Sequence, residues 1–188
     1  MKKLCNSAQG FTLIETLIVL IISAVLLMLA TPSFHAYSAK SASQKTMEAL
    51  SGLIRFTRNH ALNKLSTTVL CPSTTGTQCE QDWQSGTLIF EDKNNDYQLN
   101  DDDVVLNFST PLSDKGTITW TALRNYLAFS GQSLSANSAG SFIYCPDNKD
   151  TAYANALIVS FSGKLRYAED SNHDGIKESG NNNNIACL

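Results

Sequence analysis

Hydrophobic and polar residues are distributed very unevenly along this chain of 188 residues. The segment 11–30 reads FTLIETLIVLIISAVLLMLA and contains one charged residue, Glu15. At about 1.5 Å rise per residue, twenty helical residues span about 30 Å, which is the thickness of a bilayer core. We therefore expect a transmembrane helix over residues 11–30, preceded by a short polar leader, residues 1–10.

Residues 31–65 keep a helical period but become amphipathic. Their apolar positions follow three- and four-residue spacing, while charged residues fall largely on other faces. The apolar positions are Met47, Leu50, Ile54, Ala61 and Leu65. Pro32 is expected to kink the helix rather than to end it. The pattern predicts one long helix from about Phe11 to about Leu65, whose second half, residues 31–65, lies on the core of a domain.

Residues 66–188 change to a period of two, with short apolar segments separated by turn clusters. The predicted strands are Thr67–Cys71, Gly86–Glu91, Val104–Phe108, Gly116–Thr121, Tyr126–Ser130, Ser141–Cys145, Ala156–Phe161 and Lys164–Tyr167. Short strands at regular spacing indicate an antiparallel sandwich or meander. The predicted fold class is α+β, with the long N-terminal helix packed on the antiparallel β-sheet head. A helix with a mostly irregular head is the alternative.

The charge of the chain limits its partners. The formal net charge is −3, and removal of residues 1–10 takes away Lys2 and Lys3, leaving 12 basic and 17 acidic side chains, or −5. Binding to nucleic acid needs clustered Lys and Arg to neutralise phosphates, so DNA binding would require a local basic patch. The two leader lysines also favour an orientation with this end in the cytoplasm and the head outside.

The chain has five cysteines, of which Cys5 falls in the leader. Four cysteines in an exported domain indicate two disulfides, for which three connectivities exist. Zinc is the competing interpretation, although the chain has no CxxC pair and no histidine at ligand spacing from a cysteine. We expect a Cys71–Cys79 bridge, which closes the short loop PSTTGTQ, and a Cys145–Cys187 bridge, which ties down the polar C-terminal tail.

The residues Gly10-Phe11-Thr12-Leu13-Ile14-Glu15 resemble the prepilin processing and assembly signature of type IV pilins and type II secretion pseudopilins. The resemblance implies cleavage after Gly10 by a prepilin peptidase, N-methylation of Phe11 and a role for Glu15 in filament assembly. A plain signal anchor and an ordinary cleaved signal peptide are the alternatives. Neither of them accounts for Gly-Phe followed by Glu at this spacing.

Glu15 has a physical use in such a filament. A carboxylate inside a spanning segment costs about 2.5–3.5 kcal/mol on insertion scales, so it needs a partner. Cleavage after Gly10 creates a new α-amine on Phe11, and in a helical stack the Glu15 of one subunit can face the Phe11 amine of its neighbour. Such a pair removes both penalties and sets the axial register between subunits.

The head resembles the GspH/FimT branch of minor pilins. The matching pieces are Val69-Leu70-Cys71-Pro72, Cys79, Trp83, Gly86, Ile89-Phe90-Glu91-Asp92, Phe129-Ser130-Gly131, Phe142-Ile143-Tyr144-Cys145, Ile158–Arg166 and Cys187. The resemblance implies a low-abundance subunit in the tip or initiation complex of a type IV pilus or a type II secretion pseudopilus. Its implied partners are other major and minor pilins or pseudopilins. It also implies a single pass through the bacterial inner membrane, with the head in the periplasm, before assembly.

Two acidic segments have oxygen donors at spacings typical of calcium loops, so Ca²⁺ is a candidate ligand although no cofactor is required. In the first, Asp92, Asn94, Asp96, Asn100 and Asp103 occupy ligand positions, but Tyr97 stands where a sharp turn favours Gly and Asp103 is shorter than the usual bidentate Glu. The second contains Asp170, Asn172, Asp174 and Glu178, with Gly175 at the sixth position. The alternative is a pair of surface turns rich in Asn and Asp, which tolerate turn geometry.

The segment Gly163-Lys164-Leu165-Arg166 is the candidate for DNA contact. Some minor pilins of this branch bind DNA during natural transformation through a similar Gly-basic-x-basic element, and alternation places Lys164 and Arg166 on one face of a strand. A solvated strand face is the alternative, because Glu169, Asp170 and Asp174 follow closely. The scattered histidines and the lack of a nucleophile or phosphate-binding motif argue against an enzyme.

Overall fold

The computed structural model describes residues 11–132 and 137–187, and for residues 29–33 and 35 it describes the backbone alone. The predicted leader, with Cys5 and Gly10, lies outside the described residues. The chain divides into two compact units, Met1–Ser38 and Ala39–Leu188, and each is described by itself.

A single long helix, α1, spans Leu13–Lys64 and continues through Pro32. It confirms the predicted helix to within two residues at each end. The prediction that Leu65 belongs to the buried row of this helix is wrong, because its side chain is 74% exposed. Leu65 has a φ of 53°, in the left-handed region where helices commonly end, and the next amide, Ser66 N, bonds to Ala61 O at 3.2 Å.

In the first unit, the side chains of α1 are exposed from its start to Met28. The predicted membrane span extends two residues further, to Leu29 and Ala30, whose side chains lie outside the described set. Within the described part of the chain, no helix combines the length and the apolar composition that a membrane crossing requires.

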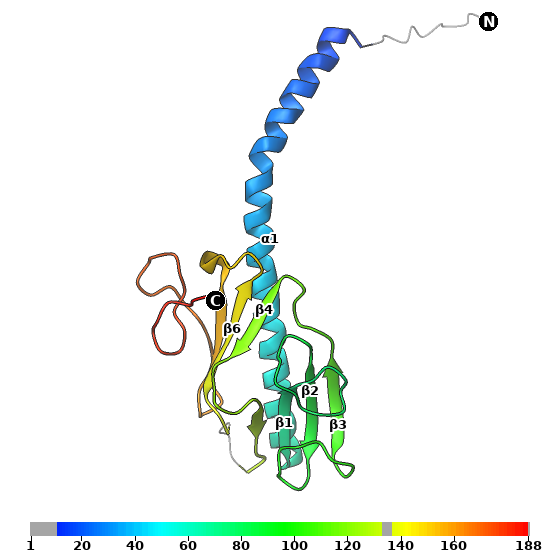
Figure 1. The fold of residues 1–188 in the computed structure, drawn as a ribbon, viewed down its shortest axis with the longest axis vertical. Helices are drawn as coiled ribbons and strands as arrows, with labels where there is room; N and C mark the ends of the chain where they lie inside the picture. The colour runs from blue at the N-terminus through cyan, green and yellow to red at the C-terminus, as the bar shows by residue number, and fades with distance from the viewer. Residues whose placement is uncertain (1–10, 133–136, 188) are drawn as a thin grey trace, which may run out of the picture. The chain divides into compact units, whose positions relative to one another are not determined.

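The second unit contains all eight predicted strands, with ends that differ from the prediction by no more than two residues. They are β1 (Thr67–Pro72), β2 (Thr87–Asp92), β3 (Val104–Ser109), β4 (Gly116–Trp120), β5 (Leu127–Phe129), β6 (Gly140–Pro146), β7 (Asn155–Val159) and β8 (Leu165–Tyr167), with a 3-10 turn, η1 (Thr151–Tyr153), before β7. The strands form two antiparallel four-stranded sheets, in the orders β3-β2-β1-β5 and β4-β6-β7-β8 (Figure 1). The fold is therefore α+β.

One hydrophobic core joins α1 to both sheets. Met47, Leu50, Ile54 and Ala61 of the helix are buried, as their spacing predicts, and they belong to a cluster with residues of each sheet. The sheet members are Leu70, Ile89, Leu127 and Phe129 from the first sheet, and Ile118, Phe142, Tyr144, Leu157 and Val159 from the second. Burial of these apolar side chains from both sheets against one helix face stabilises the head.

The segment between β1 and β2 fastens the two sheets to each other. Trp83 packs edge-on against Phe142, and its Nε1 donates to Asn125 Oδ1 at 3.0 Å. Next to it, Gln84 Nε2 donates to Gly116 O at 2.8 Å and Gln84 Oε1 accepts from Ile118 N at 3.0 Å. β4 is an edge strand, so its outer backbone groups have no neighbouring strand to bond with. Gln84 supplies hydrogen-bond partners for two of these groups.

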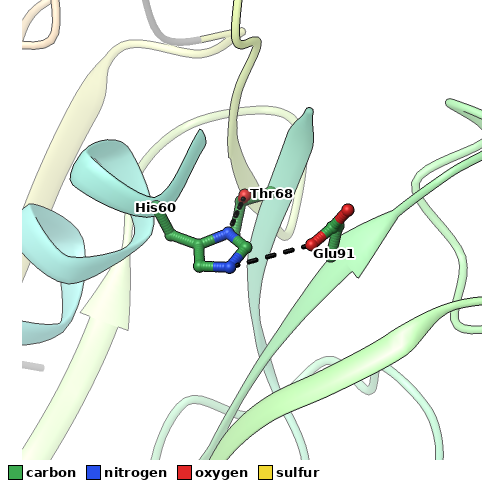
Figure 2. A network of polar contacts seen from close by, with 3 residues as sticks. All are labelled: His60, Thr68 and Glu91. Carbon is green, nitrogen blue, oxygen red and sulfur yellow. Dashed lines mark hydrogen bonds and ion pairs between the residues drawn. The ribbon is translucent and has the colours of Figure 1, made fainter. Parts of the chain in front are cut away.

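The last turns of α1 are held to the first sheet by a small polar network (Figure 2). His60 Nδ1 lies 3.1 Å from Thr68 Oγ1 in β1, and His60 Nε2 lies 3.7 Å from Glu91 Oε2 in β2. One helical side chain therefore contacts two neighbouring strands, which fixes the position of the helix end over the sheet.

Both predicted disulfides are present. Cys71 is bonded to Cys79 and Cys145 to Cys187, each pair with its Cα atoms 5.6 Å apart. The zinc interpretation is therefore wrong for these four cysteines. The second bridge lies beside a small buried cluster that includes Ile185, so the C-terminal segment is fastened by both a covalent bond and apolar contacts.

Candidate functional site

The first turn of α1 carries the residues of the predicted processing and assembly signature. Glu15 N donates to Thr12 Oγ1 at 3.3 Å, so Thr12 caps the start of the helix. Thr12 and Glu15 have the spacing of a capping box, in which a Thr caps the helix and a Glu three residues later lies in the first turn. Among the described residues, the carboxylate of Glu15 has no ion-pair partner, and Phe11, four residues before it in the sequence, is exposed.

The surface around Glu15 is apolar over several helical turns. The exposed large side chains are Phe11, Leu13, Ile14, Leu17, Ile18, Val19, Leu20, Ile21, Ile22, Val25, Leu26, Leu27 and Met28. The two hydroxyls further along are bonded within the helix, Thr16 Oγ1 to Leu13 O and Ser23 Oγ to Leu20 O, both at 2.9 Å. Over residues 11–28, Glu15 is therefore the one charged group on an otherwise apolar surface.

The first acidic segment forms a tight loop between β2 and β3. Asp92 is buried and its two oxygens accept from Asn95 N at 2.7 Å and Tyr97 N at 2.9 Å. Asp103 closes the loop by accepting from Lys93 N and Asn100 N. Two other predicted ligands of this loop, Asn94 and Asp96, are bonded to each other. Hydrogen bonds from Gln98 N and Asn100 Nδ2 lower the pKa of Asp96. These carboxylates act as caps of backbone turns.

The second acidic segment has the same internal bonding. Asp170 accepts from Asp174 N and Gly175 N, and Glu178 accepts from Ser171 N and Asn172 N. Asp174 accepts from Asn184 Nδ2 at 2.6 Å and from Ile176 N at 2.8 Å, and these bonds hold its pKa below the ordinary value of 3.8. Gly175 has a φ of 89°, which allows the sharp turn at its predicted position.

Within residues 11–132 and 137–187, no three or more His, Cys, Asp or Glu side chains form a group that could hold a metal ion. The donors of both acidic loops are already engaged with backbone amides or with each other. Calcium binding therefore stays a prediction of the sequence.

The two residues of the predicted basic pair are both exposed but have different neighbours. Lys164 lines a cavity together with Arg55 and Arg58 of α1, and Arg166 is not among the residues that line it. Arg166 lies in β8 opposite Ile158 of β7, and its side chain is exposed. Arg55 and Arg58 were not predicted as site residues, because their spacing in the helix places them away from the apolar face, where charged side chains are usually solvated. DNA binding stays a prediction.

Two family models match this chain, one over its N-terminal segment and one over most of its head. A family model described as "Type II transport protein GspH" matches residues 46–163, and one described as "Prokaryotic N-terminal methylation motif" matches residues 5–31. A long N-terminal helix packed on antiparallel sheets is the pilin fold, and the chain belongs to the GspH family of pilin-like proteins. The second match covers Gly10, Phe11 and Glu15.

The fold is also similar to that of a solved minor pilin. A crystal structure of the type IV minor pilin FimU of Pseudomonas aeruginosa (strain PAO1) has a TM-score of 0.54 and 16% sequence identity, and the alignment covers 72% of this chain and 94% of FimU. A second crystal form of FimU has a TM-score of 0.49 and 17% identity, covering 69% of this chain and 94% of that one. A comparison with curated protein sequences finds no match.

Proposed function

We propose that this protein is a minor pilin, a structural subunit that is cleaved after Gly10 and assembled into the tip or initiation complex of a type IV pilus or a type II secretion pseudopilus. The observation that carries the proposal is the exposed apolar surface of α1 over residues 11–28, interrupted by the single carboxylate of Glu15. In this proposal the role of the protein is assembly rather than catalysis.

The apolar surface has two successive environments in the proposed function. Before assembly, residues 11–30 anchor the subunit in the inner membrane, with the head in the periplasm. After assembly, the same side chains pack against the helices of neighbouring subunits. The internal bonds of Thr16 and Ser23 suit both environments, because a polar group in an apolar medium needs a partner.

Glu15 gives the assembly its specificity. Its carboxylate has no ion-pair partner among the described residues of its own chain. Cleavage by the prepilin peptidase exposes an α-amine on Phe11, which is then methylated. Pairing between Glu15 of one subunit and the Phe11 amine of the next neutralises two charges in an apolar layer, whereas a shifted register leaves both unpaired. The ion pair therefore selects one axial position among many that are equally apolar.

The processing step is tested by the mass of the protein extracted from the membrane. The parent chain is expected to begin at N-methylated Phe11, and Gly10→Leu is expected to retain residues 1–10, because the peptidase needs close approach to the backbone at this point. A mature N-terminus at any other residue contradicts the proposal.

The role of Glu15 is tested with three variants in sheared filaments. Glu15→Ala removes the charge and most of the side chain, Glu15→Gln removes the charge and keeps the side-chain length, and Thr12→Ala removes the observed cap and keeps the charge. Both Glu15 variants are expected to be processed normally and to be depleted from filaments, and Thr12→Ala is expected to assemble. If Glu15→Gln assembles as well as the parent, the ion-pair account is wrong.

A further inference from the structure

A basic cavity lies between α1 and the turn that joins β7 to β8. Its volume is about 220 Å³. It is lined by Ile54, Arg55, Arg58, Ser162, Gly163, Lys164 and Leu165. Three of these side chains are cationic and none is acidic, although the whole chain has a net negative charge.

Among the residues that the structure describes, no carboxylate forms an ion pair with a cation of this cavity. The ion pair formed by described residues is that of His60 with Glu91, which involves none of the three. Arg58 Nη1 donates to Gly163 O at 3.3 Å, while Arg58 Nε is buried and has no acceptor among the described residues. A buried donor without an acceptor is unfavourable.

The cavity is formed in advance of any ligand. The turn that carries Lys164 is closed by Ser160 N, which donates to Lys164 O at 3.1 Å, and by Gly163 N, which donates to Ser160 O at 2.8 Å. Ser160 Oγ also accepts from Lys164 N at 3.1 Å. Gly163 has a φ of 71°, which a side chain would disfavour. The backbone of this turn is therefore held in place, so ordering it adds little to the cost of binding.

We propose that this cavity binds an acidic side chain, Asp or Glu, of a neighbouring subunit in the filament, an inference that rests on the proposed function. Arg guanidinium groups match the geometry of a carboxylate through paired N–H donors, and Lys164 adds a third charge. The cavity is smaller than the roughly 300–1,000 Å³ of sites for drug-sized ligands, so it suits a single side chain. The net charge of −5 after processing opposes an extended polyanion such as DNA.

The test uses the full-length chain in cells, with a photo-crosslinking amino acid in place of Ser162, which lines the cavity and is exposed. Filaments are sheared and irradiated, and crosslinked peptides are identified by mass spectrometry. We expect a link to an Asp- or Glu-containing peptide of another pilin subunit. Arg55→Glu combined with Lys164→Glu is expected to lower its yield about ten-fold or more.

A matched control keeps the change in net charge constant. Lys45→Glu combined with Lys93→Glu reverses two exposed lysines that do not line the cavity, and it is expected to leave the crosslink unchanged. Near-UV circular dichroism of each variant in detergent checks that the head is folded. Because Arg55 and Lys164 are exposed, we expect both double variants to fold like the parent.

Three results would overturn the inference. In the first, the parent chain is present in filaments but Ser162 forms no crosslink to a subunit. In the second, the crosslink forms but does not respond to charge reversal at Arg55 and Lys164. In the third, a short duplex DNA binds the detergent-solubilised parent but not the variant with Arg55→Glu and Lys164→Glu. That result would show that the cavity binds DNA phosphate rather than a carboxylate. Absence of the parent chain from filaments is a separate result that contradicts the proposed function and this inference together.

Discussion

The indole of Trp83 meets the ring of Phe142 edge-on, with ring centroids 4.7 Å apart and an interplanar angle of 78°. Trp83 lies in the loop after β1, and Phe142 lies in β6 at the centre of the second sheet. Trp120 stacks on the same phenyl ring from β4, at 4.2 Å and 28°. The contact between two distant segments of the chain thus closes the core where the two sheets meet.

Trp83→Ala should be among the most damaging single changes in the head. Trp83 is 3% exposed, and removal of a buried aromatic side chain costs about 3–5 kcal/mol of unfolding free energy. Trp120→Ala, which removes a half-buried ring from the same partner, should cost less. Thermal unfolding of the full chain in detergent, followed by near-UV circular dichroism, compares the two. Equal losses would contradict this account of the core.

The two disulfides should contribute unequally to stability. The Cys145–Cys187 bridge closes a separation of 42 residues and the Cys71–Cys79 bridge one of 8. The loop-entropy estimate gives about 4 and about 2.6 kcal/mol, respectively. The paired change Cys145→Ala with Cys187→Ala should also expose the C-terminal segment to proteolysis, whereas Cys71→Ala with Cys79→Ala should not. Limited proteolysis with mass mapping checks this, and identical cleavage patterns would contradict it.

Gly52→Ala should stabilise the protein. Gly52 is exposed within α1, and an added Cβ would meet nothing within 4 Å. Glycine inside a helix is less favourable than alanine by about 0.5–1 kcal/mol, so the unfolding free energy should rise by about that amount. Ala49→Gly, at another exposed position of the same helix, should lower it by a similar amount. A fall in melting temperature for Gly52→Ala would contradict the prediction.

The loop of residues 170–178 should lose order in acid. The hydrogen bond from Asn184 is the main cause that lowers the pKa of Asp174 below 3.8, followed by the bond from Ile176 N. Because the folded pKa is the lower one, the stabilising contribution of this carboxylate is fully present above the unfolded pKa and is lost as the pH falls through the folded value. Asn184→Ala should raise the pKa of Asp174, which NMR titration of the Ile176 amide measures. Identical midpoints in parent and variant would contradict the assignment.

The sequence pattern predicted the helix and all eight strands, although β1 and β5 are buried along their whole length and their burial does not alternate. Leu65 shows where that reasoning fails: its spacing suits the buried row, but a left-handed residue ends the helix there, and spacing carries no information on φ. The meeting of Arg58 with the turn at Gly163, 105 residues away, also lies beyond pattern reasoning, since it depends on how α1 docks on the second sheet. The same docking brings Arg55 and Arg58 to one cavity with Lys164, which the sequence pattern did not indicate.

The bonds that Thr16 and Ser23 make to carbonyls of their own helix have a thermodynamic consequence for the proposed filament. Since these hydroxyls bring their acceptors with them, moving residues 11–28 from lipid to protein exchanges one set of apolar neighbours for another, and no hydrophobic gain drives that step. In the proposed filament, the free energy of association through this helix would then come from side-chain packing and from the Glu15 pair rather than from the hydrophobic effect.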